Sequence, residues 1–352
     1  MTAPPRIAIA AGGTAGHVVP ALAVADALRA EGASVTFVGG ERAEAEHVPA
    51  AGYELRTIRV EGLDRRNPLR AARAVLRAAL AVPRAMRILQ ALRADAVMAG
   101  GGYVAGPVGL AAVLLRIPLV VTEADSHLGV ANRLLAPFAR RVCLAFPIAG
   151  RTARRYRVTG RPVPPPATDL AAARARFGLS PDDTVVLVFG GSLGARSINF
   201  AAVEAFTGAT FRVLHAAGTR DFEALTSPGD HYDLRPYIHE FGDALLAADL
   251  VVARSGGSVF EIAAHGRPAI LIPYPAAAAD HQTANARWMA EGGAAVVIPD
   301  GELTATRLAH EVGELLHDRS HLAQMAHASA ALARPDAARE IAGELLTATA
   351  AR

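Results

Sequence analysis

The chain has 352 residues, a length that allows two domains of ordinary size. Hydrophobic residues make up 52% of it, which excludes a disordered or low-complexity protein. The 36 basic residues, all arginine, nearly balance 33 acidic ones, so the net charge of +3 does not by itself indicate nucleic-acid binding. A single cysteine, Cys143, excludes an intramolecular disulfide framework and a cysteine-based zinc site. With no secretory signal pattern at the N-terminus, we expect a protein that stays inside the cell.

Short apolar runs alternate with helical patterns through the first half of the chain. A glycine turn and a helix over 20–30 follow the first run, and buried strands are predicted at 6–11, 34–38, 96–99, 119–122 and 142–145. The 20 uncharged residues between Asp95 and Arg116 are long enough to cross a membrane. Their glycines and Pro107 predict a strand, a loop and a short helix instead. This rhythm favours a mainly parallel sheet covered by helices on both faces.

The same rhythm begins again in the second half, with strands predicted at 184–189, 250–253 and 269–272. The glycine loop 190–196 repeats the glycine loop 12–17 about half a chain later. Between the halves, the proline-rich stretch 159–166 cannot be helical and suits a stiff linker. We therefore expect an α/β fold of two doubly wound, Rossmann-like domains, at 1–160 and 161–334. Ligands of such sheets bind beyond the carboxyl ends of the strands, so a cleft between the domains is expected to hold them.

Both glycine loops have the features of an anion site. Neither has the G-x-G-x-x-G spacing or a Walker lysine, which excludes two common nucleotide fingerprints. Small residues let the backbone approach a ligand, and the helix behind each loop presents free amides. One such loop would be explained by a tight turn, but two at matching places favour phosphate or diphosphate binding. Ser192 adds a hydroxyl to the second loop.

Two further segments of the second half carry polar side chains after a strand. Segment 254–261 repeats the strand–loop–helix pattern, and Glu261 in its first helical turn suits paired sugar hydroxyls. The helix dipole alone would also favour a carboxylate there. Segment 280–285 follows Pro273-Tyr274-Pro275; Asp280 is a candidate helix N-cap and Gln282 a candidate ligand.

His17, at the end of the first glycine loop, is the candidate general base, because histidine titrates near neutrality. The alternative is a helix-start histidine bonded to a carbonyl. Clustered metal ligands are missing from the sequence, which predicts no dedicated metal site. No Gly-x-Ser-x-Gly elbow is present, which counts against a hydrolase of that design.

A basic helix is predicted after Asn67-Pro68. Ten arginines and two acids lie between Arg56 and Arg93, a local net charge of +8 in a chain of net charge +3. Arginines recur at helical spacing, with an apolar stripe one position behind them: Arg70, Arg73, Arg77, Arg84 and Arg87, and Leu69, Ala72, Leu76, Pro83 and Met86. Such a face suits an anionic membrane surface. A merely solvated helix face is the alternative.

These motifs, in this order, resemble the MurG family of glycosyltransferases over nearly the whole chain. The residues that carry the resemblance are 12–17 with 20–23, 101–104 with 106–107, 190–196, 254–256 with 261–264, and 280–282 with 285–286. The resemblance implies the GT-B architecture, in which two Rossmann-like domains face a central cleft. It also implies that a C-terminal helix over 335–352 returns to the first domain.

The resemblance implies a function as well. Family members are inverting transferases that move N-acetylglucosamine (GlcNAc) from UDP-GlcNAc to the 4-hydroxyl of N-acetylmuramyl (MurNAc)-pentapeptide-diphosphoundecaprenol. This step converts lipid I to lipid II in peptidoglycan synthesis, and thereby serves cell shape and cell division. The implied partners are UDP-GlcNAc, the undecaprenyl-diphosphate-linked acceptor and the anionic inner-leaflet surface. The implied location is peripheral, on the cytoplasmic face of the cell membrane, and no cofactor or obligatory metal is expected.

By the same resemblance, His17 is the catalytic base. Residues implied to bind the sugar donor are Thr14, Ala15, Gly16, Asp125, Arg161, Ser192, Ile238, Gly256, Gly257, Ser258, Val259, Glu261 and Gln282. Tyr103, Arg70, Arg73 and Arg77 are assigned to acceptor and membrane binding. Two positions depart from the family pattern. Asp125 replaces a common asparagine, and Pro164 replaces a donor-side arginine, for which Arg161 is the nearby substitute.

Three other functions remain open at this point. The first is another GT-B glycosyltransferase with a different lipid or metabolite acceptor. The second is a UDP-GlcNAc 2-epimerase, against which the arginine-rich helix argues. The third is a nucleotide-sugar-binding subunit that recruits a membrane partner and is not itself an enzyme. Loss of His17 without loss of turnover would leave this alternative, or a different base, open.

Overall fold

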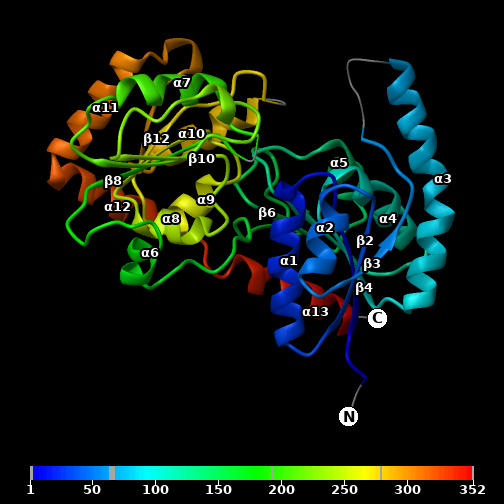
Figure 1. Cartoon of the computed structure of the whole chain (residues 1–352). Helices are drawn as coiled ribbons and strands as arrows, with labels where there is room; N and C mark the ends of the chain where they lie inside the picture. Colours follow the sequence, from blue (N-terminus) through cyan, green and yellow to red (C-terminus); the bar gives the residue numbers. More distant parts are fainter. Residues whose placement is uncertain (1–2, 63–67, 192, 278–279, 351–352) are drawn as a thin grey trace. The chain divides into compact units, whose positions relative to one another are not determined.

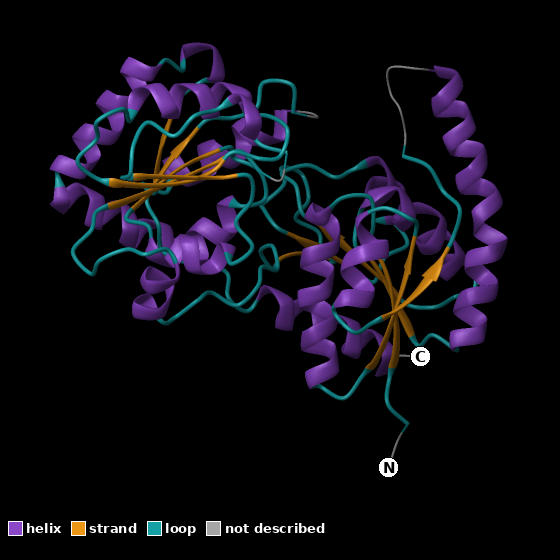
Figure 2. Cartoon of the chain, in the orientation of Figure 1, coloured by secondary structure: helices purple, strands orange, loops and turns teal. Residues whose placement is uncertain are grey.

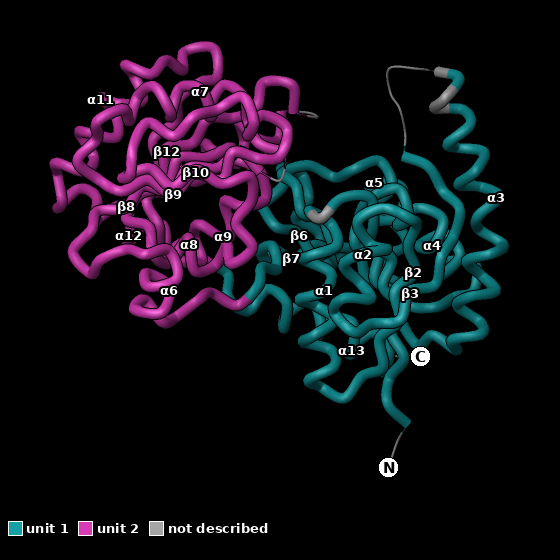
Figure 3. The backbone as a smooth tube through the Cα atoms, viewed as in Figure 1, with its two compact units in different colours: residues 1–164, 334–352 teal, residues 165–333 magenta. Residues whose placement is uncertain are grey.

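The structure is a computed structural model that describes residues 3–62, 68–191, 193–277 and 280–350, without the side chains of Ala15, Pro68, Arg70 and Ala71 (Figure 1). The chain divides into two compact units (Figure 3). The first comprises Met1–Pro164 with Arg334–Arg352, and the second Pro165–Ala333. The division falls inside the proline-rich stretch, and the C-terminal helix belongs to the first unit.

The described part of the first unit forms a parallel sheet of seven strands in the order β3-β2-β1-β4-β5-β6-β7. These strands are β1 (Arg6–Ala10), β2 (Ser34–Gly39), β3 (Glu54–Thr57), β4 (Ala96–Ala99), β5 (Leu119–Glu123), β6 (Arg141–Leu144) and β7 (Tyr156–Val158). In the register, Ile7 of β1 lies opposite Val35 of β2 and Ala96 of β4. The strands predicted in this half all form, and the parallel sheet is confirmed.

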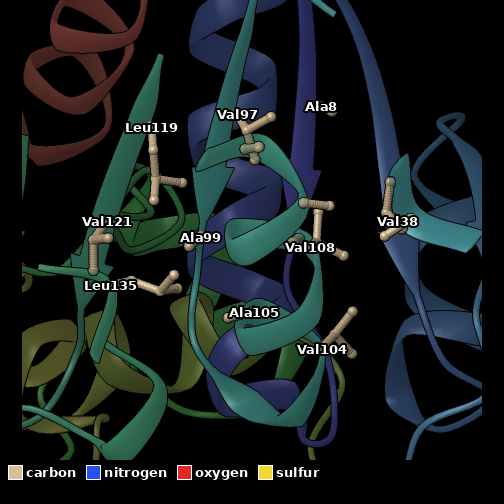
Figure 4. Close-up of a cluster of buried hydrophobic side chains, with 14 of the residues drawn as sticks. Ala8, Val38, Val97, Ala99, Val104, Ala105, Val108, Leu119, Val121 and Leu135 are labelled. Carbon is tan, nitrogen blue, oxygen red and sulfur yellow. The ribbon is translucent and has the colours of Figure 1, made fainter. Parts of the chain in front are cut away.

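Helices cover both faces of this sheet (Figure 2). They are α1 (Ala15–Ala30), α2 (Ala43–Ala50), α3 (Pro68–Leu92), α4 (Gly102–Leu114), α5 (Val130–Leu135) and α13 (Ala337–Ala350). Successive side chains of a strand point to opposite faces. Ala8 of β1 therefore joins the core under α3, α4 and α5, where Val104 and Val108 pack (Figure 4). Ile9 joins the core under α1, α2 and α13.

The long uncharged segment of the first unit folds as predicted. It forms β4, a glycine turn and α4, a helix of 13 residues. Within the ranges that the structure describes, no helix is both long and apolar enough to span a bilayer.

The second unit contains, among its described residues, a parallel sheet of six strands in the order β10-β9-β8-β11-β12-β13. The strands are β8 (Val185–Phe189), β9 (Arg212–Ala216), β10 (Tyr232–Arg235), β11 (Leu250–Ala253), β12 (Ala269–Leu271) and β13 (Ala295–Val297). The helices are α6 (Leu170–Arg176), α7 (Arg196–Ala205), α8 (Phe241–Ala247), α9 (Val259–Ala264), α10 (His281–Glu291), α11 (Ala305–His317) and α12 (Arg319–Leu332), with short 3₁₀ turns η1 (Phe222–Ala224) and η3 (Asp300–Glu302). Val186 and Val188 of β8 pack with Ile198 of α7 and Leu308 of α11. Two doubly wound units are thus present, as the sequence predicts.

Candidate functional site

The first glycine loop connects β1 to α1 and is locked against the turn before α4. Thr14 is the N-cap residue of α1, and its side chain makes no capping hydrogen bond within the described residues. A Cβ atom on Gly102, where φ is +76°, would lie 2.0 Å from the carbonyl oxygen of Gly12. Only glycine therefore allows the two segments to approach this closely.

His17 lies in the first turn of α1 and lines a small cavity of the first unit. The cavity of about 20 Å³ is also lined by Thr122, Glu123 and Arg161, and it has room for about one water molecule. The Nδ1 atom of His17 is buried and has no hydrogen-bond partner among the described residues. Burial lowers the pKa of His17; Asp125 and Glu44 oppose this shift, whereas Arg161 adds to it. The ring is therefore neutral at pH 7, the form that a general base requires.

Arg161 binds the start of α1. Its Nη2 atom donates a hydrogen bond of 2.7 Å to the carbonyl oxygen of Gly16. In a regular helix that carbonyl would accept from the amide of residue 20, but Pro20 has no N–H group. The helix runs through Pro20 from Ala15, so it begins earlier than predicted. Arg161 thus belongs to the first unit, beside His17, and its role toward the sugar donor stays a prediction.

A buried carboxylate holds the loop that carries Asp125. Glu123, at the end of β5, accepts hydrogen bonds from the amides of Asp125 (3.2 Å) and Gly129 (2.8 Å) and from Nδ2 of Asn132 (2.9 Å). Burial raises the pKa of Glu123, and these hydrogen bonds oppose the shift. Glu123 fixes the loop so that the charge of Asp125 acts on His17. The sequence alone did not reveal this role, although a carboxylate at the end of an apolar strand was a usable signal.

The charges beside His17 predict opposite shifts of its titration in two variants. Asp125→Asn removes a negative charge that raises the pKa of His17, and Arg161→Met removes a positive charge that lowers it. The acid limb of the kcat/KM profile of the wild type should lie below pH ~6.5. It should move to lower pH in Asp125→Asn and to higher pH in Arg161→Met. If the acid limbs of the two variants moved in the same direction, this assignment of charges would be contradicted.

The second glycine loop connects β8 to α7 and is locked against the loop after β9. A Cβ atom on Gly194, where φ is +76°, would lie 1.9 Å from the carbonyl oxygen of Ala217. The candidate phosphate ligand Ser192 lies outside the described residues. The geometry of this loop therefore matches that of the first: a strand end, glycines and a helix start.

The turn before α9 contains three of the residues predicted to bind the nucleotide. Gly256, Gly257 and Ser258 are half-buried, and their carbonyl oxygens accept hydrogen bonds from amides of α9. The side chain of Val259 is fully buried, because the first residue of α9 faces the core. Its predicted approach to a nucleotide therefore stays a prediction that concerns its backbone. Ile238 follows β10 and is also buried.

Gln282, in the first turn of α10, lies beside the Gly256 turn. Its Oε1 atom accepts from the amide of Tyr274 at 2.9 Å, and its carbonyl accepts from Oγ of Ser255 at 2.7 Å. A Cβ atom on Gly256 would lie 3.9 Å from Nε2 of Gln282. The side-chain carbonyl of Gln282 is thus used inside the unit, which leaves Nε2 as its hydrogen-bond donor toward a ligand.

Asp280 does begin α10, but the predicted capping bond is wrong. The residue has a left-handed φ of +54°, and its side chain caps no amide among the described residues. Instead, its Oδ1 atom accepts from Oγ1 of Thr283 at 2.6 Å.

The buried guanidinium of Arg254 joins three segments near this site. It donates to the carbonyls of Ile272 and Pro273 at 3.1 and 3.2 Å, to Asp300 at 2.6 Å and to Oγ of Ser197 at 2.9 Å. Arg254 therefore links the end of β11 to the loop after β12 and to the first turn of α7. The sequence motif contains this residue but does not reveal its partners.

Tyr103 and the basic helix α3 lie in the first unit, where their polar side chains have partners that the sequence did not predict. The Tyr103 hydroxyl donates to Oε1 of Glu44 at 2.8 Å. Arg73 and Arg77 both pair with Glu61, which leaves this group a single net positive charge; the side chain of Arg70 lies outside the described residues.

The apolar stripe named from the sequence is not the buried face of α3. Leu69 and Leu76 are 82% and 60% exposed, and Val75 and Leu80 are 61% and 69% exposed. The face that packs on the unit consists of Ala74, Ala81, Val82, Ala85 and Leu89. The helix therefore presents apolar side chains to its surroundings over its first half.

No group of three or more His, Cys, Asp or Glu side chains suited to a metal ion is found within residues 3–62, 68–191, 193–277 and 280–350.

Two doubly wound units with a glycine loop at a strand end in each form the GT-B fold, and the comparisons identify a glycosyltransferase of that fold. Residues 7–144 match the glycosyltransferase family 28 N-terminal domain, and residues 185–341 match its C-terminal domain. The chain belongs to the MurG family of these enzymes, as its relatives show.

Two relatives and one solved structure define this similarity. The UDP-N-acetylglucosamine–N-acetylmuramyl-(pentapeptide) pyrophosphoryl-undecaprenol N-acetylglucosamine transferase of Moorella thermoacetica is 42% identical over 94% of this chain and 96% of its own. The protein of that name from Nitrosococcus oceani is 41% identical over 97% of this chain and 98% of its own. The crystal structure of MurG from Acinetobacter baumannii matches with a TM-score of 0.79 and 31% identity, over 98% of this chain and 100% of that one. The likeness thus extends through both units.

Proposed function

We propose that the chain transfers GlcNAc from UDP-GlcNAc to the 4-hydroxyl of MurNAc-pentapeptide-diphosphoundecaprenol, which converts lipid I to lipid II. The observation that carries this function is the identity of about 40% to transferases of that name over nearly the full length of both proteins. It favours the transferase over a 2-epimerase and over a subunit without catalysis.

The reaction is one displacement at the anomeric carbon of the sugar. The acceptor 4-hydroxyl oxygen forms a bond to that carbon, and the bond from the carbon to the UDP oxygen breaks. The hydroxyl proton passes to a base, and the α-linked donor gives a β-linked product. We assign the base to His17, because burial keeps its ring neutral. Thr14, Ala15 and Gly16 surround the N-terminus of α1 and are assigned to the diphosphate of a substrate.

The sugar donor is assigned mainly to the second unit. Glu261 takes the ribose hydroxyls, Nε2 of Gln282 binds the transferred sugar, and the backbone of 256–259 approaches the nucleotide. Ile238 is assigned to the uracil. Ser192 and the amides at the start of α7 take the diphosphate, whose growing negative charge fixed amides and the helix dipole stabilise. We propose that the reaction needs no metal ion.

The decisive assay combines purified protein with labelled UDP-GlcNAc, with and without a short-chain lipid I analogue, in the presence of a metal chelator. We expect UDP release that depends on the acceptor, with a β-linked disaccharide product. Interconversion of the donor with its 2-epimer in the absence of acceptor would overturn the transferase and leave the fold assignment intact. Activity that the chelator abolishes and added metal restores would overturn the metal-free mechanism alone.

We also propose that the protein binds the cytoplasmic face of the cell membrane peripherally, and that peptidoglycan synthesis there supports cell shape and division. The exposed leucines of α3 lie on the same helix as Arg84 and Arg87. These two arginines and Arg56 line a hollow together with the apolar residues Ile88, Ala91 and Leu92. Apolar side chains beside cations suit the boundary between acyl chains and anionic headgroups.

Vesicle binding tests this surface. The double variant Leu76→Ser with Leu80→Ser should bind vesicles containing anionic lipid at least ~10-fold more weakly, since each buried leucine contributes about 1.5–3 kcal/mol. Leu170→Ser is the matched control, because Leu170 is an exposed leucine of the second unit. Turnover of a water-soluble acceptor should be unchanged in all three proteins. Equal vesicle binding by the double variant and the wild type would exclude this face.

A further inference from the structure

Glu44 is a buried carboxylate to which the proposed reaction gives no role. It lies in the first turn of α2 and has an exposed fraction of 0%. Its Oε2 atom accepts from the amide of Gly13 at 2.8 Å, and its Oε1 atom accepts from the amide of Gly40 at 2.7 Å and the hydroxyl of Tyr103 at 2.8 Å. In the described part of the chain, no cation forms an ion pair with it. Its charge is therefore balanced by hydrogen bonds alone.

The three partners of Glu44 follow three neighbouring strands. Gly13 follows β1, Gly40 follows β2 and Tyr103 follows β4, and these strands are adjacent in the order β2-β1-β4. Their carboxyl ends meet at the edge of the sheet where ligands bind in such folds. One side chain thus joins the glycine loop, the end of β2 and the start of α4.

A carboxylate is the chemical group that this position requires. All three partners donate, and an ionised carboxylate accepts at both oxygens and donates nothing. Burial disfavours its charge, but the hydrogen bonds from Gly13, its own amide, Tyr103 and Gly40 outweigh burial, so the pKa of Glu44 is lowered. A glutamine would place an NH₂ group against at least one of these donors.

The ring of His17 depends on the same segments. A Cβ atom on Gly101 would lie 2.8 Å from Nδ1 of His17, so the ring rests against the turn that leads to Tyr103. On the other side, Gly13 is next to Thr14, the N-cap residue of the helix that carries His17. Glu44 holds both supports, one through the Gly13 amide and one through the Tyr103 hydroxyl.

We propose that Glu44 is a positioning residue of the transfer reaction: it fixes the first glycine loop and the start of α4 so that His17 is held in place toward the acceptor. This role rests on the function proposed above. Any contact of Tyr103 with the acceptor is then made by its ring, because its hydroxyl donates to Glu44.

Glu44→Gln tests the role, with Glu46→Gln as the matched control, since Glu46 is an exposed glutamate of the same helix turn. In Glu44→Gln, kcat/KM for the acceptor should fall at least ~10-fold, because misplacement of a reacting group is costly. The dissociation constant of UDP-GlcNAc should stay within about twofold, because most of the residues assigned to the sugar donor lie in the second unit. Glu46→Gln should match the wild type in both. Unchanged acceptor kcat/KM in Glu44→Gln, or a parallel loss of donor affinity, would overturn the proposal.

Amide exchange provides a readout that needs no turnover. The amides of Gly13 and Gly40 should exchange at least ~10-fold faster in Glu44→Gln than in the wild type, because each loses its acceptor. Exchange should be unchanged in Glu46→Gln. If the wild type transfers no GlcNAc, the proposed function fails, whereas equal exchange in Glu44→Gln and wild type refutes the placement of Glu44.

Tyr103→Phe keeps the proposal testable if Glu44→Gln does not fold. This variant retains the ring and removes one of the three donors to Glu44. Acceptor kcat/KM should fall severalfold with donor affinity unchanged, and exchange of the Gly40 amide, which shares Oε1 with Tyr103, should change. Wild-type kinetics in Tyr103→Phe would contradict the link between Glu44 and α4.

Discussion

His17→Ala should lower kcat for GlcNAc transfer by about 10²–10⁴-fold, the range over which a positioned general base accelerates proton transfer. The expected loss is in kcat, because the acceptor hydroxyl loses its proton only as the new bond forms. Affinity for UDP-GlcNAc should change little, since most of the residues assigned to the sugar donor lie in the second unit. Steady-state kinetics with the lipid I analogue and a separate titration of UDP-GlcNAc measure the two effects.

A matched control distinguishes the loss of the catalytic base from a general effect of replacing a histidine by alanine. His310 is an exposed histidine of α11 in the second unit, and His310→Ala should behave as the wild type. If His17→Ala retains activity within a factor of ~10 and keeps the acid limb of the wild type, another group is the base. In that case the buried, neutral ring of His17 serves packing at the start of α1.

Interior strands were predictable from the sequence, and edge strands were not. β1, β4, β8 and β11 are continuous apolar runs because both faces of a central strand are buried. The strands that the apolar runs did not reveal include all four sheet edges, β3, β7, β10 and β13. An edge strand such as Glu54–Thr57 is short, polar and half in solvent, so it lacks that signal.

One interior strand, β9, was missed for a different reason. His215 is the fourth of its five residues and is fully buried, and its ring hydrogen-bonds with the hydroxyl of Tyr232 (2.7 Å) and Oδ1 of Asn199 (3.0 Å). Burial lowers the pKa of His215 to about 3, so the ring is neutral. A histidine in a run of apolar residues weakens a strand prediction, because its partners lie elsewhere in the chain.

The candidate site shows the same division between local and distant information. Both glycine loops and the place of His17 were predictable, because strand, glycines and helix follow one another in the sequence. The contacts of Glu44 and Arg254 were not, since Glu44 meets Tyr103 59 positions away and Arg254 meets Ser197 57 positions away. Such pairs exist only once the sheets are assembled. They are the contacts that hold the loops in their working positions.

Helix α3 illustrates an ambiguity that periodicity alone does not resolve. Two apolar stripes run along it, and either satisfies helical spacing. The face toward the unit carries mainly small residues, three alanines and one valine beside one leucine, because α3 packs closely against α4. The larger leucines of the first half remain outward, which is the reverse of an ordinary amphipathic helix.

Gly194→Ala should destabilise the second unit by about 2–5 kcal/mol. The left-handed backbone conformation of Gly194 costs an alanine about 1–2 kcal/mol. The new Cβ atom would also lie 1.9 Å from the carbonyl oxygen of Ala217, and this backbone group has to move. Overpacking of this kind costs about 1–3 kcal/mol more. At roughly 2–4 °C per kcal/mol for a unit of this size, the midpoint of its thermal unfolding should fall by at least ~4 °C.

Gly191→Ala separates strain from collision in the same loop. Gly191 also has a positive φ, +91°, but its Cβ position has no neighbouring atom within 4 Å among the described residues. Its alanine variant should therefore lose only the ~1–2 kcal/mol of backbone strain. Added UDP should identify the thermal transition of the second unit, because a ligand raises the unfolding temperature of the unit that binds it. Equal losses of unfolding free energy in the two variants would mean that the 217–218 loop moves away from the new Cβ atom of Gly194→Ala without a measurable cost. The close approach of that loop to Gly194 would then contribute nothing to holding the proposed diphosphate site.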